Sequence, residues 1–397
     1  MTLNVVIGGD ALQGPLTGIG YYSKCLSQEL ISADDIELSG VFSNGLLGSR
    51  DYENLLKTFD SEDFDHSSYN RKSSIIIPLV RSNQILYRLI KRYRHYKVSS
   101  ALNSLKDKNT VYHEPNFIPY SYKGPTVITV HDLSYIRYPQ THPKTRIDYM
   151  TRYLPQAVNE AGAIMVDSEF VKNEMLDLEF VKEPGRIHVA HLGCDTGFKV
   201  RGAEESELLD VLARYGLNYR SYILAVGTIE PRKNLERLVA AYMALPKEIA
   251  DSNPLVLVGG QGWKSGSLME LVNKVELPHR VIFTGYIPKQ HLRVLTSGAL
   301  LFCYPSLYEG FGLPVLEAMS SGTPVVTSNT SSLAEVAGDG ALLVDPKDVD
   351  AINNGLEQVI RNTSLQQMLI DNGLVQASKF SWQKCAAATR TVYKALS

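Results

Sequence analysis

The strongest constraint on the fold is a repeated order of short apolar runs and longer amphipathic stretches. Residues 3–7 form an apolar run that ends in two glycines, and a helical pattern covers residues 21–30 after a glycine-bearing loop. A buried strand, a glycine loop and a helix in that order are typical of the opening of a doubly wound α/β domain. The order therefore predicts a mostly parallel sheet.

Further apolar runs predict the other strands of two such units. In the first unit they cover residues 36–42, 74–79, 110–113, 126–130, 163–167 and 187–190. In the second unit they cover 222–226, 255–258, 281–283, 299–303 and 324–326, with a helix at 234–243. The two units have similar size and join near residues 195–220. A chain of 397 residues is long enough for both, so we predict two α/β domains.

Composition restricts the class of protein and its compartment. Hydrophobic residues make up 44% of the chain and charged residues 21%, and no stretch approaches the roughly 20 apolar residues of a membrane span. The start lacks the features of a signal peptide. The four cysteines are far apart and form no CxxC pair, which argues against a zinc site or disulfides. We expect a cytoplasmic protein that binds no metal and no nucleic acid.

Charge is distributed unevenly, although the net charge is only −2. Residues 66–106 contain nine Lys or Arg and no Asp or Glu, which implies an anionic partner. Read as a helix, residues 81–97 have an apolar face made of Ile85, Leu86, Leu89 and Tyr93. Another face carries Arg88, Arg92 and His95. Such a helix can lie on an anionic bilayer. The alternative is an ordinary surface helix whose apolar face packs on the domain core.

Two adjacent cations follow a predicted strand of the second unit. Gly227 ends the strand, and Arg232 and Lys233 come just before a helix start at Asn234. Arginine offers a planar fork for phosphate oxygens and lysine a point charge. A diphosphate leaving group gains negative charge as its sugar bond breaks, so fixed cations would stabilise the transition state. The alternative is a solvated turn.

A second loop carries two carboxylates, Glu309 and Glu317, eight residues apart. Gly310 and Gly312 would let the backbone approach a ligand, and Pro314 suits the first turn of a helix. Backbone N–H groups at that helix start favour phosphate. We place Glu317 in the first helical turn, where the dipole also favours a carboxylate. The alternatives are a helix-start charge for Glu317 and an exposed loop acid for Glu309.

These motifs together resemble glycosyltransferase family 4. The stretch YEGFGLPVLEAMSSGTPVV resembles the family's two-glutamate motif, TGIGYY its N-terminal glycine loop and VHDL its strand-end histidine. GTIEPRKNL resembles its phosphate clamp, and GGQGW and TGYIPKQHL its donor-domain loops. The motifs follow the family's order and cover nearly the whole chain.

The resemblance implies the α/β fold called GT-B, in which two Rossmann-like, doubly wound domains face each other across a cleft. Residues 1–200 would form the acceptor-side domain and residues 201–379 the domain that binds the nucleotide sugar. The C-terminal helix, residues 380–397, would return to the first domain.

The resemblance also implies roles for individual residues. Arg232 and Lys233 would bind the diphosphate, Glu309 would lie near the donor sugar and Glu317 would accept hydrogen bonds from the ribose. His131 would reach the sugar ring, and its alternative is a strand-end histidine satisfied within the protein. Further donor-binding positions would be Gly18, Gly20, Gly227, Tyr286, Ile287, Gly310, Phe311 and Gly312.

The implied reaction is transfer of a sugar with retention of configuration and without a metal or cofactor. Two Asp-x-Asp matches, at 63–65 and 348–350, could suggest a metal site, but neither follows a predicted strand and we interpret both as structural. The GTIEPRKNL form of the phosphate clamp resembles that of bacterial mannosyltransferases of O-antigen and capsule assembly. The donor substrate would be GDP-mannose and the acceptor a lipid-linked saccharide, with residues 81–97 on the inner face of the plasma membrane.

Three other functions stay open at this point. The donor could be another nucleotide sugar, linked to UDP or dTDP. The chain could be a nucleotide-sugar epimerase of the same fold, which needs no external acceptor. A non-catalytic nucleotide-binding protein is the third, and the presence of both Glu309 and Glu317 argues against it.

Overall fold

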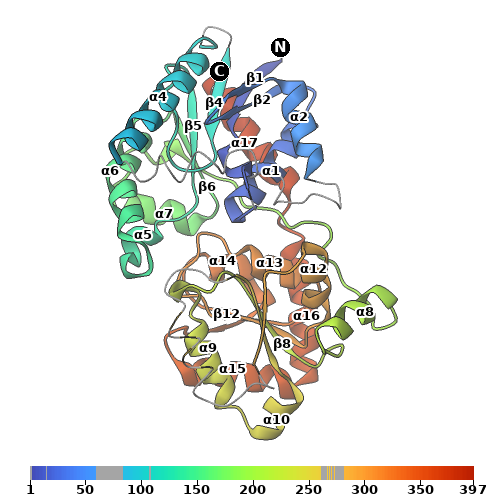
Figure 1. Ribbon diagram of the computed structural model, residues 1–397. Helices are drawn as coiled ribbons and strands as arrows, with labels where there is room; N and C mark the ends of the chain where they lie inside the picture. The colour runs from blue at the N-terminus through green and yellow to red at the C-terminus, as the bar shows by residue number, and fades with distance from the viewer. Residues whose placement is uncertain are drawn as a thin grey trace.

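The computed structural model describes residues 2–14, 16–59, 84–106, 109–260 and 281–397, together with residues 266, 268, 270 and 272, and only the backbone of 84–91. The chain forms two α/β lobes that face each other (Figure 1). Each lobe is a sheet covered by helices, as the alternating pattern predicts. The carboxyl ends of both sheets point toward the boundary between the lobes, which is where an open α/β sheet binds its ligands.

The N-terminal lobe contains a seven-stranded sheet in the order β3-β2-β1-β4-β5-β6-β7. All neighbours are parallel except β2 and β3. The strands are β1 (Leu3–Gly8), β2 (Ile36–Phe42), β3 (Gly45–Leu47), β4 (Thr110–Glu114), β5 (Thr126–Val130), β6 (Ala163–Val166) and β7 (Ile187–Val189). Buried aliphatic side chains fill the central strands, as expected for a sheet covered on both faces.

Helices cover both faces of this sheet. They are α1 (Gly18–Ile31), α2 (Ser49–Thr58), α4 (Gln84–Asn103), α5 (Ser134–Arg137), α6 (Lys144–Glu160) and α7 (Glu169–Asp177). The last helix of the chain, α17 (Trp382–Leu396), packs against α1, β6 and β7 (Figure 1). The hydroxyl of Tyr393 lies 2.6 Å from Nδ1 of buried His113, which fixes α17 to the N-terminal sheet.

The C-terminal lobe contains a fully parallel six-stranded sheet in the order β10-β9-β8-β11-β12-β13. The strands are β8 (Ile223–Val226), β9 (Leu255–Val258), β10 (Val281–Gly285), β11 (Leu301–Tyr304), β12 (Val325–Ser328) and β13 (Leu342–Val344). The helices are α8 (Ser206–Arg214), α9 (Leu235–Met243), α10 (Lys247–Ser252), α12 (Lys289–Gly298), α13 (Leu313–Ser320), α14 (Ser332–Ala337), α15 (Val349–Arg361) and α16 (Thr363–Ala377). The domain limits at residues 200 and 379 stay a prediction.

Some expectations from the sequence need correction. Glu317 is the fifth residue of α13 and does not lie in its first turn, because the helix starts at Leu313. The short strands β3 and β13 were not predicted. The predicted strand at 74–79 and the Asp-x-Asp match at 63–65 lie outside the described residues. The match at 348–350 is structural, because the Asp348 carboxylate accepts the backbone N–H groups of Asp350 and Ala351 and caps α15.

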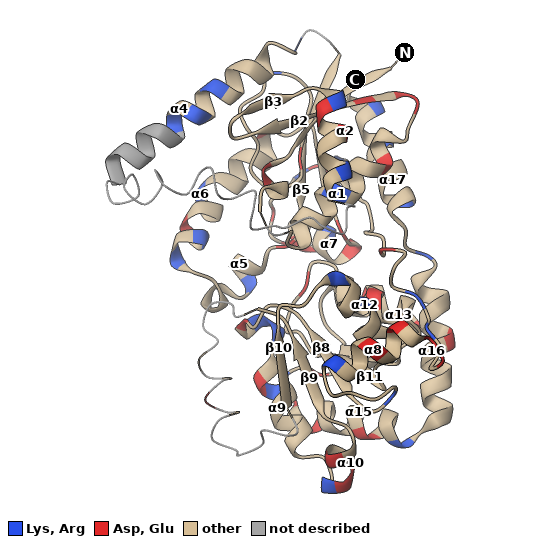
Figure 2. Ribbon diagram, turned by 45° about the vertical axis from the view of Figure 1, so that its right-hand side comes forward, with Lys and Arg blue, Asp and Glu red and all other residues tan. Residues whose placement is uncertain are grey.

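Helix α4 stands away from the body of the N-terminal lobe and carries a row of Lys and Arg (Figure 2). Its inner end is anchored by Val98 and Leu102, which are buried against β1, β2 and β4. Tyr93, predicted on the apolar face with Ile85, Leu86 and Leu89, is 67% exposed; the side chains of the other three lie outside the description. Within the described ranges, no helix is long and apolar enough to cross a membrane.

Candidate active site

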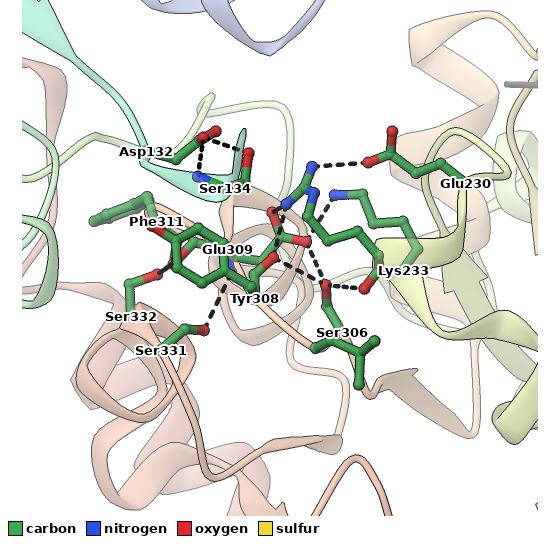
Figure 3. A network of polar contacts seen from close by, with 12 residues as sticks. Asp132, Ser134, Glu230, Lys233, Ser306, Tyr308, Glu309, Phe311, Ser331 and Ser332 are labelled. Carbon is green, nitrogen blue, oxygen red and sulfur yellow. Dashed lines mark hydrogen bonds and ion pairs between the residues drawn. The ribbon is translucent and has the colours of Figure 1, made fainter. Parts of the chain in front are cut away.

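Two loops of the C-terminal lobe meet at the boundary with the other lobe (Figure 3). The first loop follows β8 and contains Arg232 and Lys233 in a short 3-10 turn, Pro231–Lys233. The second follows β11 and contains Glu309. Asn234 joins them, because its amide nitrogen donates to the carbonyl oxygen of Pro305 at 2.9 Å. Strands β8 and β11 are neighbours in the sheet, so the two loops emerge side by side.

Glu309 is buried at the centre of this site. Its carboxylate accepts hydrogen bonds from Arg232 at 2.8 Å and from Lys233 at 2.8 Å. The Tyr304 hydroxyl donates at 3.0 Å and the Ser306 hydroxyl at 2.7 Å. Burial raises the pKa of Glu309, but the charges of the two cations outweigh it and lower the pKa to about 2. Glu309 is therefore a carboxylate at any physiological pH.

The Arg232 guanidinium donates hydrogen bonds to three groups of the site. Besides Glu309, it donates to the carbonyl oxygen of Tyr308 at 2.7 Å and to the Glu230 carboxylate at 2.8 Å. Its Nε is buried and lacks a hydrogen-bond partner among the described residues. Lys233 also donates to the Tyr304 hydroxyl at 2.6 Å, and burial lowers its pKa. The sequence predicts the cations and Glu309 as separate parts of the site, whereas the structure joins them in one network.

Tyr304 and Ser306 belong to this network, although the sequence analysis assigned them no role. Tyr304 is the last residue of β11 and Ser306 lies two residues beyond it. Both are buried, and both hydroxyls contact the same oxygen of Glu309. Their position directly after a strand that leads into the glycine loop is the signal that could have found them.

His131 lies on the N-terminal lobe, directly after β5, with both ring nitrogens bonded. Nδ1 lies 2.7 Å from the Asp167 carboxylate and Nε2 lies 2.7 Å from the Pro115 carbonyl oxygen. Burial lowers the pKa of His131, but Asp167 outweighs it and the pKa is raised. Two acceptors suit an imidazolium that donates from both nitrogens. This arrangement matches the alternative of a satisfied histidine, and contact with a sugar ring stays a prediction.

Gly310 brings the second loop against His131. A Cβ atom at Gly310 would lie 1.8 Å from the carbonyl oxygen of His131, so the backbones touch only because position 310 has no side chain. The Ser168 hydroxyl donates to the Gly310 carbonyl oxygen at 2.7 Å. The loop that carries Glu309 is thus held directly by the other lobe.

Tyr308 forms a second contact between the lobes. We call this residue and its partners Leu133 and Glu174 the Tyr308 socket. Its buried hydroxyl accepts the Leu133 N–H at 2.9 Å and donates to the Glu174 carboxylate. Glu174 also accepts from Nε of Arg137 at 2.7 Å. Because Leu133 is two residues from His131 and Tyr308 precedes Glu309, the socket fixes the two predicted site segments relative to each other.

A cavity of about 650 Å³ lies between α1 and α12. It is lined in part by Tyr21, Asp195, Tyr286, Lys289 and Arg293. Lys289 contacts the Asp195 carboxylate at 2.6 Å and lies 4.1 Å from the centre of the Tyr21 ring. Tyr286 is 70% exposed.

Glu317 lies near this cavity and contrasts with Glu309. Burial raises the pKa of Glu317 to about 7, against the opposing charge of Lys289. The described residues include no hydrogen-bond or ion-pair partner for its carboxylate within 4 Å. The ribose role predicted for Glu317 requires a carboxylate that still has acceptor capacity, and this one has it.

The remaining predicted positions are distributed over both lobes. Ile287 is buried, and Phe311 packs its ring 5.7 Å from that of Phe380 in the interior. Gly312 has φ +104° and precedes α13. Gly18 and Gly20 lie in the first turn of α1, and Gly227 follows β8. The contact of these positions with a donor stays a prediction.

Metal-ligating side chains do not gather in the part of the chain that the structure describes. No group of three or more His, Cys, Asp or Glu there has the arrangement that a metal ion needs.

Known relatives share this architecture. The family model described as glycosyl transferases group 1 matches residues 216–375. The O-antigen chain mannosyltransferase B of Escherichia coli is 36% identical over 395 residues, covering 99% of this chain and 100% of that protein. The serotype-specific mannosyltransferase WbdA of Escherichia coli is 30% identical over 266 residues, covering 66% of this chain and 32% of that longer protein.

Among solved structures, Anabaena HepE in complex with UDP-glucose aligns with a TM-score of 0.71 at 16% identity, covering 99% of this chain and 100% of that one. At such identity the likeness concerns the fold. The fold, the matching family model and a full-length relative above 30% identity show that this chain belongs to the group 1 glycosyl transferases, with their GT-B fold.

Proposed function

We propose that this glycosyltransferase moves mannose from GDP-mannose to a saccharide acceptor, with retention of configuration. The observation that carries the proposal is the largely buried pair Arg232 and Lys233, held at the carboxyl end of the sheet by Glu309. The named function of the full-length relative, an O-antigen chain mannosyltransferase, supports mannose and a role in surface polysaccharide synthesis. Retention and the guanine base rest on the family resemblance.

The site suits departure of a diphosphate. As the bond from the sugar to the diphosphate breaks, negative charge grows on the leaving oxygens, and Arg232 and Lys233 need no rearrangement to stabilise it. The unpartnered Nε of Arg232 adds a donor. The low pKa of Glu309 keeps it ionised. In this proposal it holds the two cations in place and lies near the donor sugar. No cofactor is required beyond the donor substrate.

We also propose that the enzyme works at the inner face of the plasma membrane on a lipid-linked acceptor. Support comes from α4, whose residues 92–97 are all exposed and include Arg92, Lys97 and Tyr96. Cations near an anionic surface each contribute about 1 kcal/mol to binding. The double variant Arg92→Gln/Lys97→Gln should sediment less with anionic vesicles than the parent. If the parent itself does not sediment with them, the membrane proposal is wrong.

The donor is tested by measuring nucleotide release and product formation. The protein is incubated with GDP-mannose, UDP-glucose or a dTDP-sugar, each with and without a mannoside acceptor. We expect acceptor-dependent release of GDP and an α-linked product by NMR. If nucleotide is released only from a UDP-sugar or a dTDP-sugar, that sugar nucleotide and not GDP-mannose is the donor. If the donor is epimerised and no sugar is transferred, the chain is a nucleotide-sugar epimerase and not a transferase.

A further inference from the structure

The N-terminal lobe contains a cavity of about 540 Å³ whose lining is separate from the clamp, as we call Arg232 and Lys233 of the other lobe. It lies over the carboxyl ends of β1, β2 and β4, between α4 and α6, and we call it the α4–α6 cavity. Its lining includes Asp10, Arg94, Glu114, Tyr120, Arg146 and Tyr149. Both signs of charge and two aromatic rings therefore face the same space.

The floor of the cavity presents two carboxylates held in place by the protein. Asp10 accepts the Ser43 N–H at 2.7 Å with one oxygen and the Tyr120 hydroxyl at 2.7 Å with the other. Glu114 accepts the Tyr112 hydroxyl at 2.7 Å and the Asn116 N–H at 3.0 Å. Each oxygen keeps a second lone pair for a ligand. Oriented carboxylates with spare lone pairs suit the hydroxyl groups of a saccharide.

The rim of the cavity carries two arginines, Arg94 from α4 and Arg146 from α6. Both side chains are exposed, and neither guanidinium group forms an ion pair or hydrogen bond with another described residue. The acids of the floor are satisfied by other donors, so these guanidinium groups remain available to a ligand. Guanidinium groups bind phosphate in a bidentate manner.

The two arginines lie at different ends of the cavity. Asp132 follows His131, and α5 begins two residues after it, while Arg146 lies in the first turn of α6, which packs against α5. Arg146 therefore lies at the end that faces the clamp. Arg94 lies on the basic helix α4, next to Arg92 and Lys97. A ligand in the cavity could thus reach from the basic helix to the neighbourhood of the clamp.

We propose that the α4–α6 cavity binds a saccharide that carries a phosphate group, with the phosphate on Arg94 and the sugar on Asp10, Glu114 and Arg146. The inference rests on the proposed function, in which this ligand is the acceptor. It goes further by assigning the phosphate to one side chain and by setting the orientation. The sugar points toward Asp132, and the phosphate points toward α4, where a lipid chain would leave.

The test is a calorimetric titration of the full chain with two probes, a short-chain alkyl mannosyl diphosphate and the matching alkyl mannoside. Saturating GDP is present so that neither probe enters the donor clamp. Arg94→Gln and Arg146→Gln are compared with Arg92→Gln and Arg152→Gln. Each control removes one exposed cation from the same helix without touching the cavity.

We expect the parent to bind the diphosphate at least about tenfold more tightly than the mannoside, as one charge-assisted contact allows. Arg94→Gln should remove that preference, Arg146→Gln should weaken both probes alike, and the controls should match the parent. Retention of the preference in Arg94→Gln, an equal loss in Arg92→Gln, or no binding of either probe would overturn the proposal. Failure of the proposed function would instead appear as lack of transfer from GDP-mannose in the separate release assay.

Discussion

Glu309 and Glu317 lie eight residues apart in one motif, yet their surroundings give them opposite properties. Two cations and two hydroxyls contact Glu309, and its pKa is lowered to about 2. Burial without a direct partner raises the pKa of Glu317 to about 7. The first glutamate is therefore part of a closed hydrogen-bond network, whereas the carboxylate of the second can still accept hydrogen bonds from a ligand.

Removal of Lys233 should produce the largest effect. In Lys233→Met the apolar stem is kept, but the leaving diphosphate loses a cation that stabilises the transition state. We expect kcat to fall about a hundredfold or more with saturating donor. Lys347→Met, at an exposed lysine of the same lobe, is the matched control. Near-normal turnover in Lys233→Met would remove the clamp from the mechanism.

The two glutamates should differ sharply in their effect on stability. Glu309→Gln leaves Lys233 without its counter-charge and Arg232 with Glu230 alone. Breaking a largely buried ion pair in this way typically costs about 3–5 kcal/mol of the free energy of unfolding. Glu317→Gln removes a carboxylate that has no direct partner, so denaturant unfolding should show little or no loss. Equal losses in the two variants would mean that Glu317 has a structural partner and that the contrast is wrong.

The Tyr308 socket should affect catalysis more than donor binding. Tyr308→Phe removes the hydroxyl through which the C-terminal lobe contacts Leu133 and Glu174 of the N-terminal lobe. A lost buried hydrogen bond of this kind costs about 1–3 kcal/mol, so kcat should fall about tenfold while GDP affinity is kept. Tyr153→Phe, at a partly exposed tyrosine of α6, is the control. A weaker GDP affinity with unchanged kcat would contradict a role in fixing the two lobes.

The opposite pKa shifts predict two separate pH windows for stability. The pKa of Glu309 is lowered when folded, so its contribution is present above its unfolded value near 4.5 and is lost as pH falls toward 2. The pKa of Glu317 is raised, so its burial favours folding at low pH and that gain is lost as pH rises from 4.5 to about 7. Unfolding curves of Glu317→Gln should show a smaller change between pH 4.5 and 7 than those of the parent. Part of the change should remain, because burial also raises the pKa of Glu114 to about 7.

Much of the fold follows from local patterns, but the site depends on strand order. Apolar runs predicted the strands from β8 to β12 because buried parallel strands are continuous in hydrophobicity. Arg232 and Glu309 meet only because β8 and β11 are neighbours in the sheet, which no local pattern reveals. For the same reason the partners of His131 and the cavity residues Asp10 and Glu114 were not predicted. Side chains on separate strands become neighbours only through tertiary packing.

In the proposed reaction, Arg232 and Lys233, joined by Glu309, bind the diphosphate of the donor. The most direct measurement is the melting temperature of the parent and of Lys233→Met with and without GDP, since a ligand that binds the folded state stabilises it. We predict that GDP raises the melting temperature of the parent and protects Lys233→Met far less at the same concentration. Equal protection of both proteins would contradict the claim.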